Sequence, residues 1–244
     1  MSARYVWLGV NAALMAVSLW MIFLWVPTEA NLGIVQRALY FHVPVAIIAM
    51  AAIVLVAIGS VAFLMTGRPR WDWFAYASAE TGVLFGGLAL VTGSIWARPI
   101  WNVWWTWDAK LTTTLILWFI FVGYLMLRAY APQGRQGARL AAVLAIVGAI
   151  DAPIIYYAAD LWRTAHPARI AGPGAEGSLE GDMALTLLVS IVTLVSLYAY
   201  VLVERYRVRR SEAELVELGR EVQSLAASGQ RAGGVSAAPA TAGG

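Results

Sequence analysis

The sequence contains no cysteine and few charged residues, and both shortages narrow its possible functions. Only 13% of its 244 residues are Asp, Glu, Lys or Arg, about half the share in an average soluble domain. Without cysteine the chain forms no disulfide, thiolate metal site, iron–sulfur cluster or covalent haem link. Its two histidines, His42 and His166, are not part of a His-Glu-x-x-His motif, so we expect no catalytic zinc and no enzyme.

The hydrophobic residues, 61% of the chain, predict a polytopic membrane protein. The sequence pI near 9.3 would also fit a nucleic-acid-binding protein. However, the basic residues lie in short loops between apolar segments, which is typical of a protein oriented in a lipid bilayer. We therefore expect no nucleic acid partner.

Six apolar segments are long enough to span a membrane as helices, so the predicted fold is all-α. The first segment ends without a small-x-small cleavage site, and we interpret it as a retained helix rather than a signal peptide. The expected helices are Val6–Val26, Val43–Met65, Tyr76–Trp96, Leu111–Tyr130, Leu140–Ala159 and Met183–Val203.

Basic residues predict the orientation of these helices. Twelve of the 17 Lys and Arg residues fall on the side of both termini, which places both termini in the cytoplasm. Loops one, three and five then face outward, into the periplasm of a diderm bacterium. The five outer basic residues are Arg37, Arg98, Lys110, Arg163 and Arg169.

Some residues within the apolar segments have a predicted structural role. Gly82, Gly86 and Gly87 favour close helix packing. Glu80 and Asp151 are ionisable, and such groups normally face the bundle interior or a wet cavity. Pro44 fits the first turn of the second helix.

The composition changes after the membrane domain, which we expect to comprise residues 1–203. Residues 204–227 begin with a run of basic residues that ends the membrane-spanning segment. They continue as a predicted short amphipathic cytoplasmic helix, which Ser211 could cap. Residues 228–244 are rich in Gly and Ala and predict a disordered tail.

Five of the 12 tryptophans lie within twelve residues: Trp96 ends the third predicted helix, and the other four lie in the loop before the fourth. An interfacial aromatic belt explains isolated tryptophans elsewhere in the chain. One or two rings suffice for anchoring, so this cluster predicts a surface for a large planar ligand. The loop residues concerned are Trp101, Trp104, Trp105 and Trp107.

Both histidines are predicted at outer helix ends, on the same face as these tryptophans. Haem iron needs one or two axial ligands, and imidazole is a common one. The haem propionates favour basic partners, for which Arg37, Arg98 and Lys110 are the nearest candidates. Asp108 could cap the fourth helix, pair with Arg98 or Lys110, or do both. A purely structural role for either histidine stays open.

The segment from Trp101 to Thr112 resembles the tryptophan-rich "WWD" domain, here within residues 96–112, of the haem-handling proteins of cytochrome c biogenesis. Phe41-His42-Val43-Pro44 and the Trp-x-Thr-x-His segment that ends at His166 are similar to the CcmC family of the system I pathway. Asn102 stands where this family usually has glycine, and its tolerance of left-handed backbone suits that place.

The resemblance implies that His42 and His166 ligate a non-covalent haem b on the outer face of the bacterial inner membrane. It also implies that Trp101, Trp104, Trp105, Trp107 and Asp108 hold the porphyrin, with Arg37 and Lys110 as basic residues of the site. CcmC-like proteins deliver haem to the chaperone CcmE, with the small protein CcmD and the CcmA–CcmB ABC transporter as partners. Two alternatives stay open: a bis-histidine b-type cytochrome that carries electrons, and a transporter subunit without haem.

Overall fold

The computed structural model describes residues 3–130, 134–162 and 179–235. Most of these residues are helical, and six helical segments are long and apolar enough to cross a membrane. This confirms the predicted all-α fold with six membrane-spanning helices. The six spans are Ala3–Trp25, Ile34–Thr66, Pro69–Trp101, Ala109–Tyr130, Arg135–Ala158 and Gly181–Ala227.

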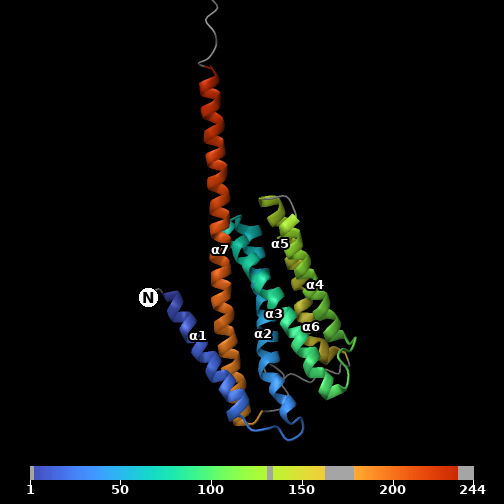
Figure 1. The fold of residues 1–244 in the computed structure, drawn as a ribbon. Coiled ribbons are helices and arrows are strands. Elements are labelled where there is room, and N and C mark those ends of the chain that lie inside the picture. The colour runs from blue at the N-terminus through green and yellow to red at the C-terminus, as the bar shows by residue number, and fades with distance from the viewer. Residues whose placement is uncertain (1–2, 131–133, 163–178, 236–244) are drawn as a thin grey trace, which may run out of the picture.

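Helix α3 (Pro69–Trp101) runs antiparallel to both α2 (Leu39–Thr66) and α4 (Ala109–Tyr130) in the bundle (Figure 1). Gly67 ends α2 in the left-handed conformation, with φ of 64°, and its N–H donates to the carbonyl of Phe63 at 2.8 Å. Pro69 then starts α3, where its missing N–H has no helical partner to lose. This tight connection brings α2 and α3 together along their length.

The glycines of α3 allow the neighbouring helices to approach closely, as predicted. A Cβ at Gly82 would lie 3.1 Å from the Cβ of Ala52 on α2, and one at Gly86 would lie 3.0 Å from Cδ1 of Trp118 on α4. The indole N–H of Trp118 donates to the carbonyl of Val83 at 2.9 Å. Small residues on α3 therefore fix its distance from both neighbours.

The second helix begins earlier than the sequence predicted. α2 starts at Leu39, after the 3-10 helix η2 (Ile34–Ala38), so Pro44 lies inside it and the expected first-turn position is wrong. An internal proline costs about 3 kcal/mol because it removes one backbone hydrogen bond. Leu39, Tyr40 and Ile22 are buried in one core cluster, and burial of a leucine side chain stabilises a fold by about 1.5 to 3 kcal/mol. The packing of Leu39 is thus comparable with the cost of the proline and favours a helix that begins before it.

The predicted fifth helix is divided into α5 (Arg135–Ala149) and α6 (Asp151–Leu161). Pro153 explains the division, since it cannot donate the hydrogen bond that the carbonyl of Ala149 would accept in a continuous helix. Asp151 thus lies at the start of α6, where one carboxylate oxygen is buried without a hydrogen-bond partner.

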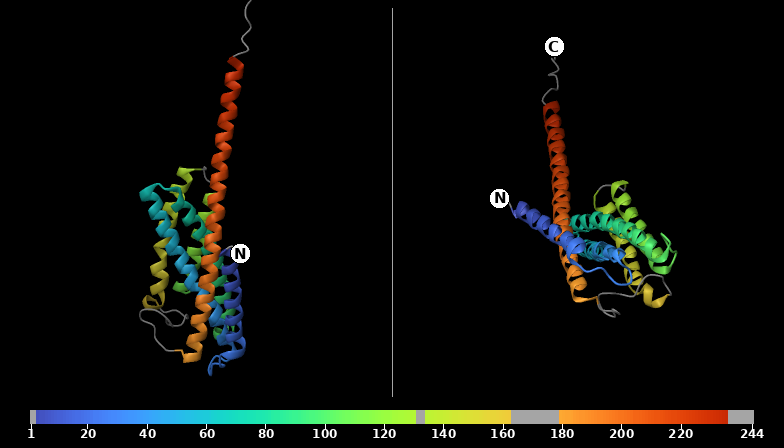
Figure 2. Two further views of the ribbon diagram at one scale, coloured as in Figure 1. Left: turned by 90° about the vertical axis from the view of Figure 1, so that its left-hand side faces the viewer. Right: turned by 60° about the horizontal axis from the view of Figure 1, so that its bottom comes forward.

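The first helix, α1 (Ala3–Trp20), continues as the π-helix η1 (Met21–Trp25) and packs on α7. Ser18 lies 3.2 Å from the hydroxyl of Ser190, and the indole N–H of Trp7 donates to Ser196 at 3.2 Å. In Figures 1 and 2 the two helices diverge toward the N-terminus of α1.

Helix α7 (Gly181–Val235) has 55 residues and extends well beyond the bundle, as Figure 2 shows. It passes through Ser211 without interruption, so the prediction that Ser211 caps a separate short helix is wrong. Ion pairs one turn apart, Arg209–Glu212 at 2.7 Å and Arg210–Glu214 at 2.8 Å, cross this point and favour continuous helix. Residues 236–244 of the predicted tail lie outside the described residues.

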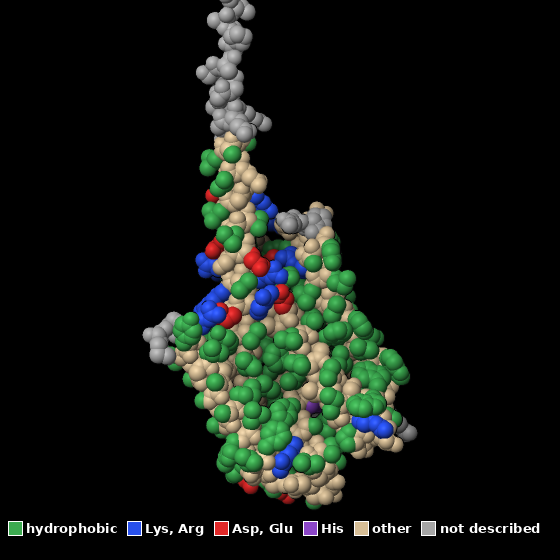
Figure 3. All heavy atoms as spheres, viewed as in Figure 1, with side chains coloured by type: hydrophobic (Ala, Val, Ile, Leu, Met, Phe, Trp, Pro, Cys, Tyr) green, Lys and Arg blue, Asp and Glu red, His purple; other side chains and the backbone are tan. Residues whose placement is uncertain are grey.

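The two ends of the bundle differ in their side chains. Figure 3 shows charged side chains gathered around the base of the α7 extension, above a broad hydrophobic surface. We call this the arginine end, defined by Arg128, Arg205 and Arg209. The opposite end, where residues 102–108 connect α3 to α4, is the tryptophan end.

Candidate functional site

His42 is the fourth residue of α2 and lies at the tryptophan end, partly buried against α3. Its Nδ1 atom is 3.1 Å from the hydroxyl oxygen of Thr92. The imidazole ring also contacts the indole of Trp96, with 5.8 Å between ring centroids and 49° between their planes. Two residues one helical turn apart on α3 therefore contact the ring.

Gly93 allows His42 to lie this close to α3. A Cβ at position 93 would lie 2.9 Å from Cε1 of the imidazole, which is closer than a real Cβ contact. Any larger residue would displace the ring or the helix. The close approach of α2 and α3 at this level thus depends on the absence of a side chain.

Lys110 brings α4 into the same region. It is the second residue of α4, and it lies near enough to His42 for its charge to act on the imidazole. Three consecutive membrane helices converge here: α2 supplies the imidazole, α3 its supports and α4 a positive charge.

Asn102 determines how the chain leaves α3. Its φ of 57° makes it the single non-glycine residue with positive φ among those described, which agrees with the predicted left-handed backbone. Arg98 donates to the Asn102 carbonyl at 2.5 Å and also to its side-chain oxygen. Arg98 therefore binds the C-terminus of its own helix, where a cation is favoured.

Asp108 caps α4, which confirms one of the roles predicted for it. One carboxylate oxygen accepts the backbone N–H of Leu111 at 3.0 Å, and the other accepts the hydroxyl of Thr106 at 2.8 Å. These bonds fix the last residues of the tryptophan loop to the beginning of the next helix.

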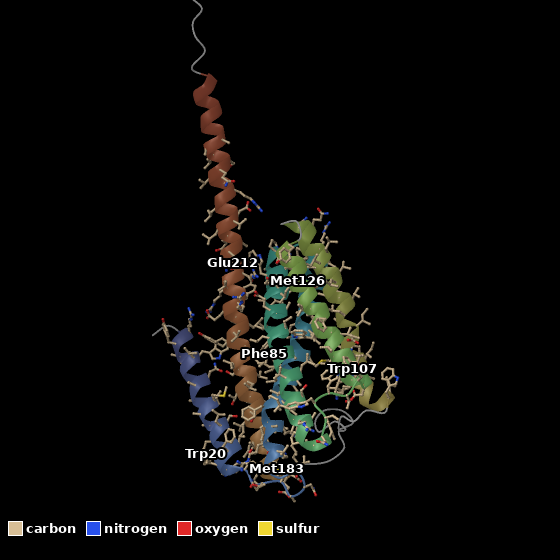
Figure 4. All side chains as sticks on the ribbon, turned by 45° about the vertical axis from the view of Figure 1, so that its right-hand side comes forward. Trp20, Phe85, Trp107, Met126, Met183 and Glu212 are labelled. Atoms are coloured by element: carbon tan, nitrogen blue, oxygen red, sulfur yellow. The ribbon has the colours of Figure 1, made fainter. Side chains whose placement is uncertain are left out.

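The loop indoles differ in exposure. Trp104 and Trp107 are 59% and 77% exposed, whereas Trp101 and Trp105 are partly buried. Figure 4 shows Trp107 pointing away from the helices. Trp105 contacts it edge to face, with centroids 5.9 Å apart. The loop therefore presents two large aromatic faces outside the bundle, supported by a third ring.

The indole N–H groups of Trp96 and Trp105 are buried without a hydrogen-bond acceptor. Buried donors are normally paired, and an unpaired one costs about 1 to 3 kcal/mol. A ligand with carboxylate groups would supply acceptors in this region. A nitrogen donor, exposed aromatic faces and a nearby cation together fit haem, which is planar, anionic and metal-bearing.

Arg37 lies in η2, immediately before α2. Its guanidinium donates to the carbonyl of Phe23 at 3.0 Å and so joins η2 to η1. This bond fixes the start of α2 relative to the end of α1.

His166 lies outside the described residues, so its predicted pairing with His42 stays a prediction. The structure adds Thr92, Gly93 and Trp96 as neighbours of His42, none of which was predicted as a site residue. The sequence shows that these three residues are spaced to lie near one another on a helix. It does not show that the residue they contact is His42.

The chain matches the family model described as CcmC, Heme exporter protein C, over residues 1–219. It is 37% identical over 173 residues to a Heme exporter protein C of Bradyrhizobium diazoefficiens, covering 70% of this chain and 65% of the relative. It is 34% identical over 181 residues to the protein of that name from Haemophilus influenzae, covering 74% of each chain.

A third relative, the Heme exporter protein C of Escherichia coli K12, is 34% identical over 161 residues, which is 66% of each chain. The chain thus spans just under two thirds of the Bradyrhizobium and Escherichia relatives. The family match covers the helices that carry His42, Thr92 and the tryptophan loop. The chain belongs to the CcmC, or Heme exporter protein C, family.

Proposed function

We propose that this protein binds haem non-covalently at its tryptophan end and presents it for cytochrome c maturation. The observation that carries the proposal is that His42 packs against Thr92 and Trp96 at the end of the bundle where the α3–α4 loop exposes two indoles. In this arrangement His42 is an axial ligand, and Trp104 and Trp107 stack on the porphyrin. Lys110 and Arg98 are candidate partners for the propionates, and His166 is the proposed second ligand. The three relatives described above are each named Heme exporter protein C, which agrees with haem as the ligand.

The proposal places the tryptophan end on the periplasmic face of the inner membrane. The distribution of basic residues supports this orientation, since the arginine end carries the larger number. From there the protein would deliver haem to a CcmE-type chaperone, with CcmD and the CcmA–CcmB transporter as partners. We propose a carrier rather than an enzyme, because delivery needs ligation and release but no covalent change in this chain.

Exposure of the site is consistent with delivery. Two of the four loop indoles are largely outside the bundle, so an incoming protein can reach a ligand held against them. Haem bound at helix ends is also more accessible to an acceptor protein than haem enclosed between helices.

A haem titration of the purified full-length protein in lipid nanodiscs tests this function. We expect a Soret band that weakens or shifts in His42→Ala and His166→Ala, and a lower haem affinity in the double variant Trp104→Ala/Trp107→Ala. Trp20→Ala is the matched control, since Trp20 is 51% exposed at the same end of the bundle. No Soret band in the unaltered protein, or equal losses in Trp20→Ala, would refute the proposal.

A further inference from the structure

The hydroxyl of Thr92 lies between two hydrogen-bonding groups. Its oxygen is 2.7 Å from the carbonyl of Leu88, four residues earlier on α3, and 3.1 Å from Nδ1 of His42. A hydroxyl has one proton to donate and two lone pairs that accept. A carbonyl can only accept, so the bond to Leu88 uses the proton of Thr92.

Thr92 can then interact with His42 only as an acceptor, and Nδ1 of the imidazole must be the donor. A neutral imidazole carries a single proton, so a proton on Nδ1 leaves Nε2 with a free lone pair. Among the described residues, the side-chain hydrogen bond of this ring is at Nδ1. The backbone of Ala89, three residues before Thr92 on α3, also forms a hydrogen bond with the ring, and its carbonyl too can only accept. With the proton on Nδ1, Nε2 is the nitrogen whose lone pair could bind a metal.

We propose that Thr92 is a positioning residue for His42: its hydroxyl accepts the Nδ1 proton and thereby presents Nε2 as the ligand atom. The use of Nε2 for haem iron rests on the proposed function, whereas the tautomer does not. Gly93 and Trp96 restrict the ring in the same orientation, by close approach and by ring contact. Hydrogen-bond partners of this kind commonly orient histidines that bind metals.

The tautomer is measurable in the haem-free protein by ¹⁵N NMR of labelled histidine. The variant His166→Gln leaves His42 as the single histidine, and alkaline pH keeps its ring neutral. We expect a protonated Nδ1 and an unprotonated Nε2. In Thr92→Val, which has nearly the same shape but no acceptor, the population should move toward the Nε2–H tautomer. Thr92→Ser should restore the original state.

Two NMR results would overturn the inference: a protonated Nε2 with Thr92 intact, or an unchanged tautomer in Thr92→Val. Haem titration of the same variants, made with His166 present, supplies a second readout. Thr92→Val should bind haem about 10- to 100-fold more weakly, whereas Thr92→Ser should stay close to the unaltered protein. Unchanged affinity in Thr92→Val would also overturn the positioning role.

The two measurements separate this inference from the proposed function. If the unaltered protein binds no haem, the proposed function fails. The NMR result then still decides whether Thr92 controls the tautomer of His42.

Discussion

The guanidinium of Arg205 on α7 donates two hydrogen bonds to the carboxylate of Glu80 on α3, at 3.0 and 2.5 Å. Arg209, one turn further along α7, donates to the same carboxylate at 3.2 Å. The Arg209 guanidinium also lies 3.5 Å from the ring centroid of Tyr76. Glu80 therefore attaches the base of the α7 extension to the bundle, at the arginine end.

Replacing Glu80 should loosen this attachment. Glu80→Gln removes the charge that two arginines share, and we expect the free energy of unfolding to fall by about 1 to 3 kcal/mol. Glu212→Gln is the matched control, since Glu212 also pairs with Arg209 but is 52% exposed, and its loss should cost less than about 0.5 kcal/mol. Thermal unfolding in nanodiscs measures both, and similar losses would contradict the assigned role.

Local features of the candidate site were predictable from the sequence, because their partners are close in the chain. Asp108 precedes an apolar run, and its bond to Leu111 spans three residues. Asn102 was expected to adopt a left-handed backbone, and it does so at the end of α3. Both follow from rules for helix ends that need no tertiary information.

Contacts between distant segments were not predictable. Thr92 and His42 are 50 residues apart, and Arg205 and Glu80 are 125 residues apart. Hydropathy places these residues in helices but does not determine the rotation of one helix against another. The start of α2 and the continuity of α7 were mispredicted for a related reason. Pro44 favours the first turn of a helix, but packing at Leu39 starts α2 earlier. Ser211 favours a helix N-terminus, but ion pairs around it favour continuous helix.

The two roles of Asp108 can be separated by a pair of substitutions. Asp108→Asn keeps a good N-cap but removes the charge, whereas Asp108→Ala removes both and should destabilise the fold by about 1 kcal/mol. If the charge contributes to haem binding or partner docking, Asp108→Asn should impair haem transfer at unchanged unfolding temperature. Loss of stability in Asp108→Asn comparable with that in Asp108→Ala would show that the amide does not preserve the cap.

The loop between η1 and η2 should respond to acid through Glu29. Its carboxylate accepts the backbone N–H groups of Leu32 and Asn31, and these bonds hold the pKa of Glu29 below its ordinary value. A lowered pKa means that the stabilisation is present at neutral pH and is lost as the pH falls through that lowered value. Hydrogen exchange of residues 29–33, corrected for intrinsic rates, should show protection that is lost at a lower pH than the ordinary titration of a glutamate would give.

Glu29→Gln is the control for this prediction. It should reduce the protection at neutral pH and remove its dependence on acid, because the amide does not titrate. Protection that declines identically in Glu29→Gln and the unaltered protein would assign the effect to another group.

The close approach of His42 to Gly93 gives a test that leaves all polar groups in place. Gly93→Ala puts a Cβ 2.9 Å from Cε1 of the imidazole, so the ring must move away from Thr92 and Trp96. We expect a shifted Soret band and about tenfold weaker haem binding, as for the loss of a hydrogen-bond partner of the ligand. Gly123→Ala on α4 is the matched control, since a Cβ there has no neighbour within 4 Å. That change should leave the spectrum unaltered and can stabilise the helix by up to about 1 kcal/mol. If Gly93→Ala binds haem with the unaltered spectrum and affinity, the position of His42 against α3 does not matter for ligation.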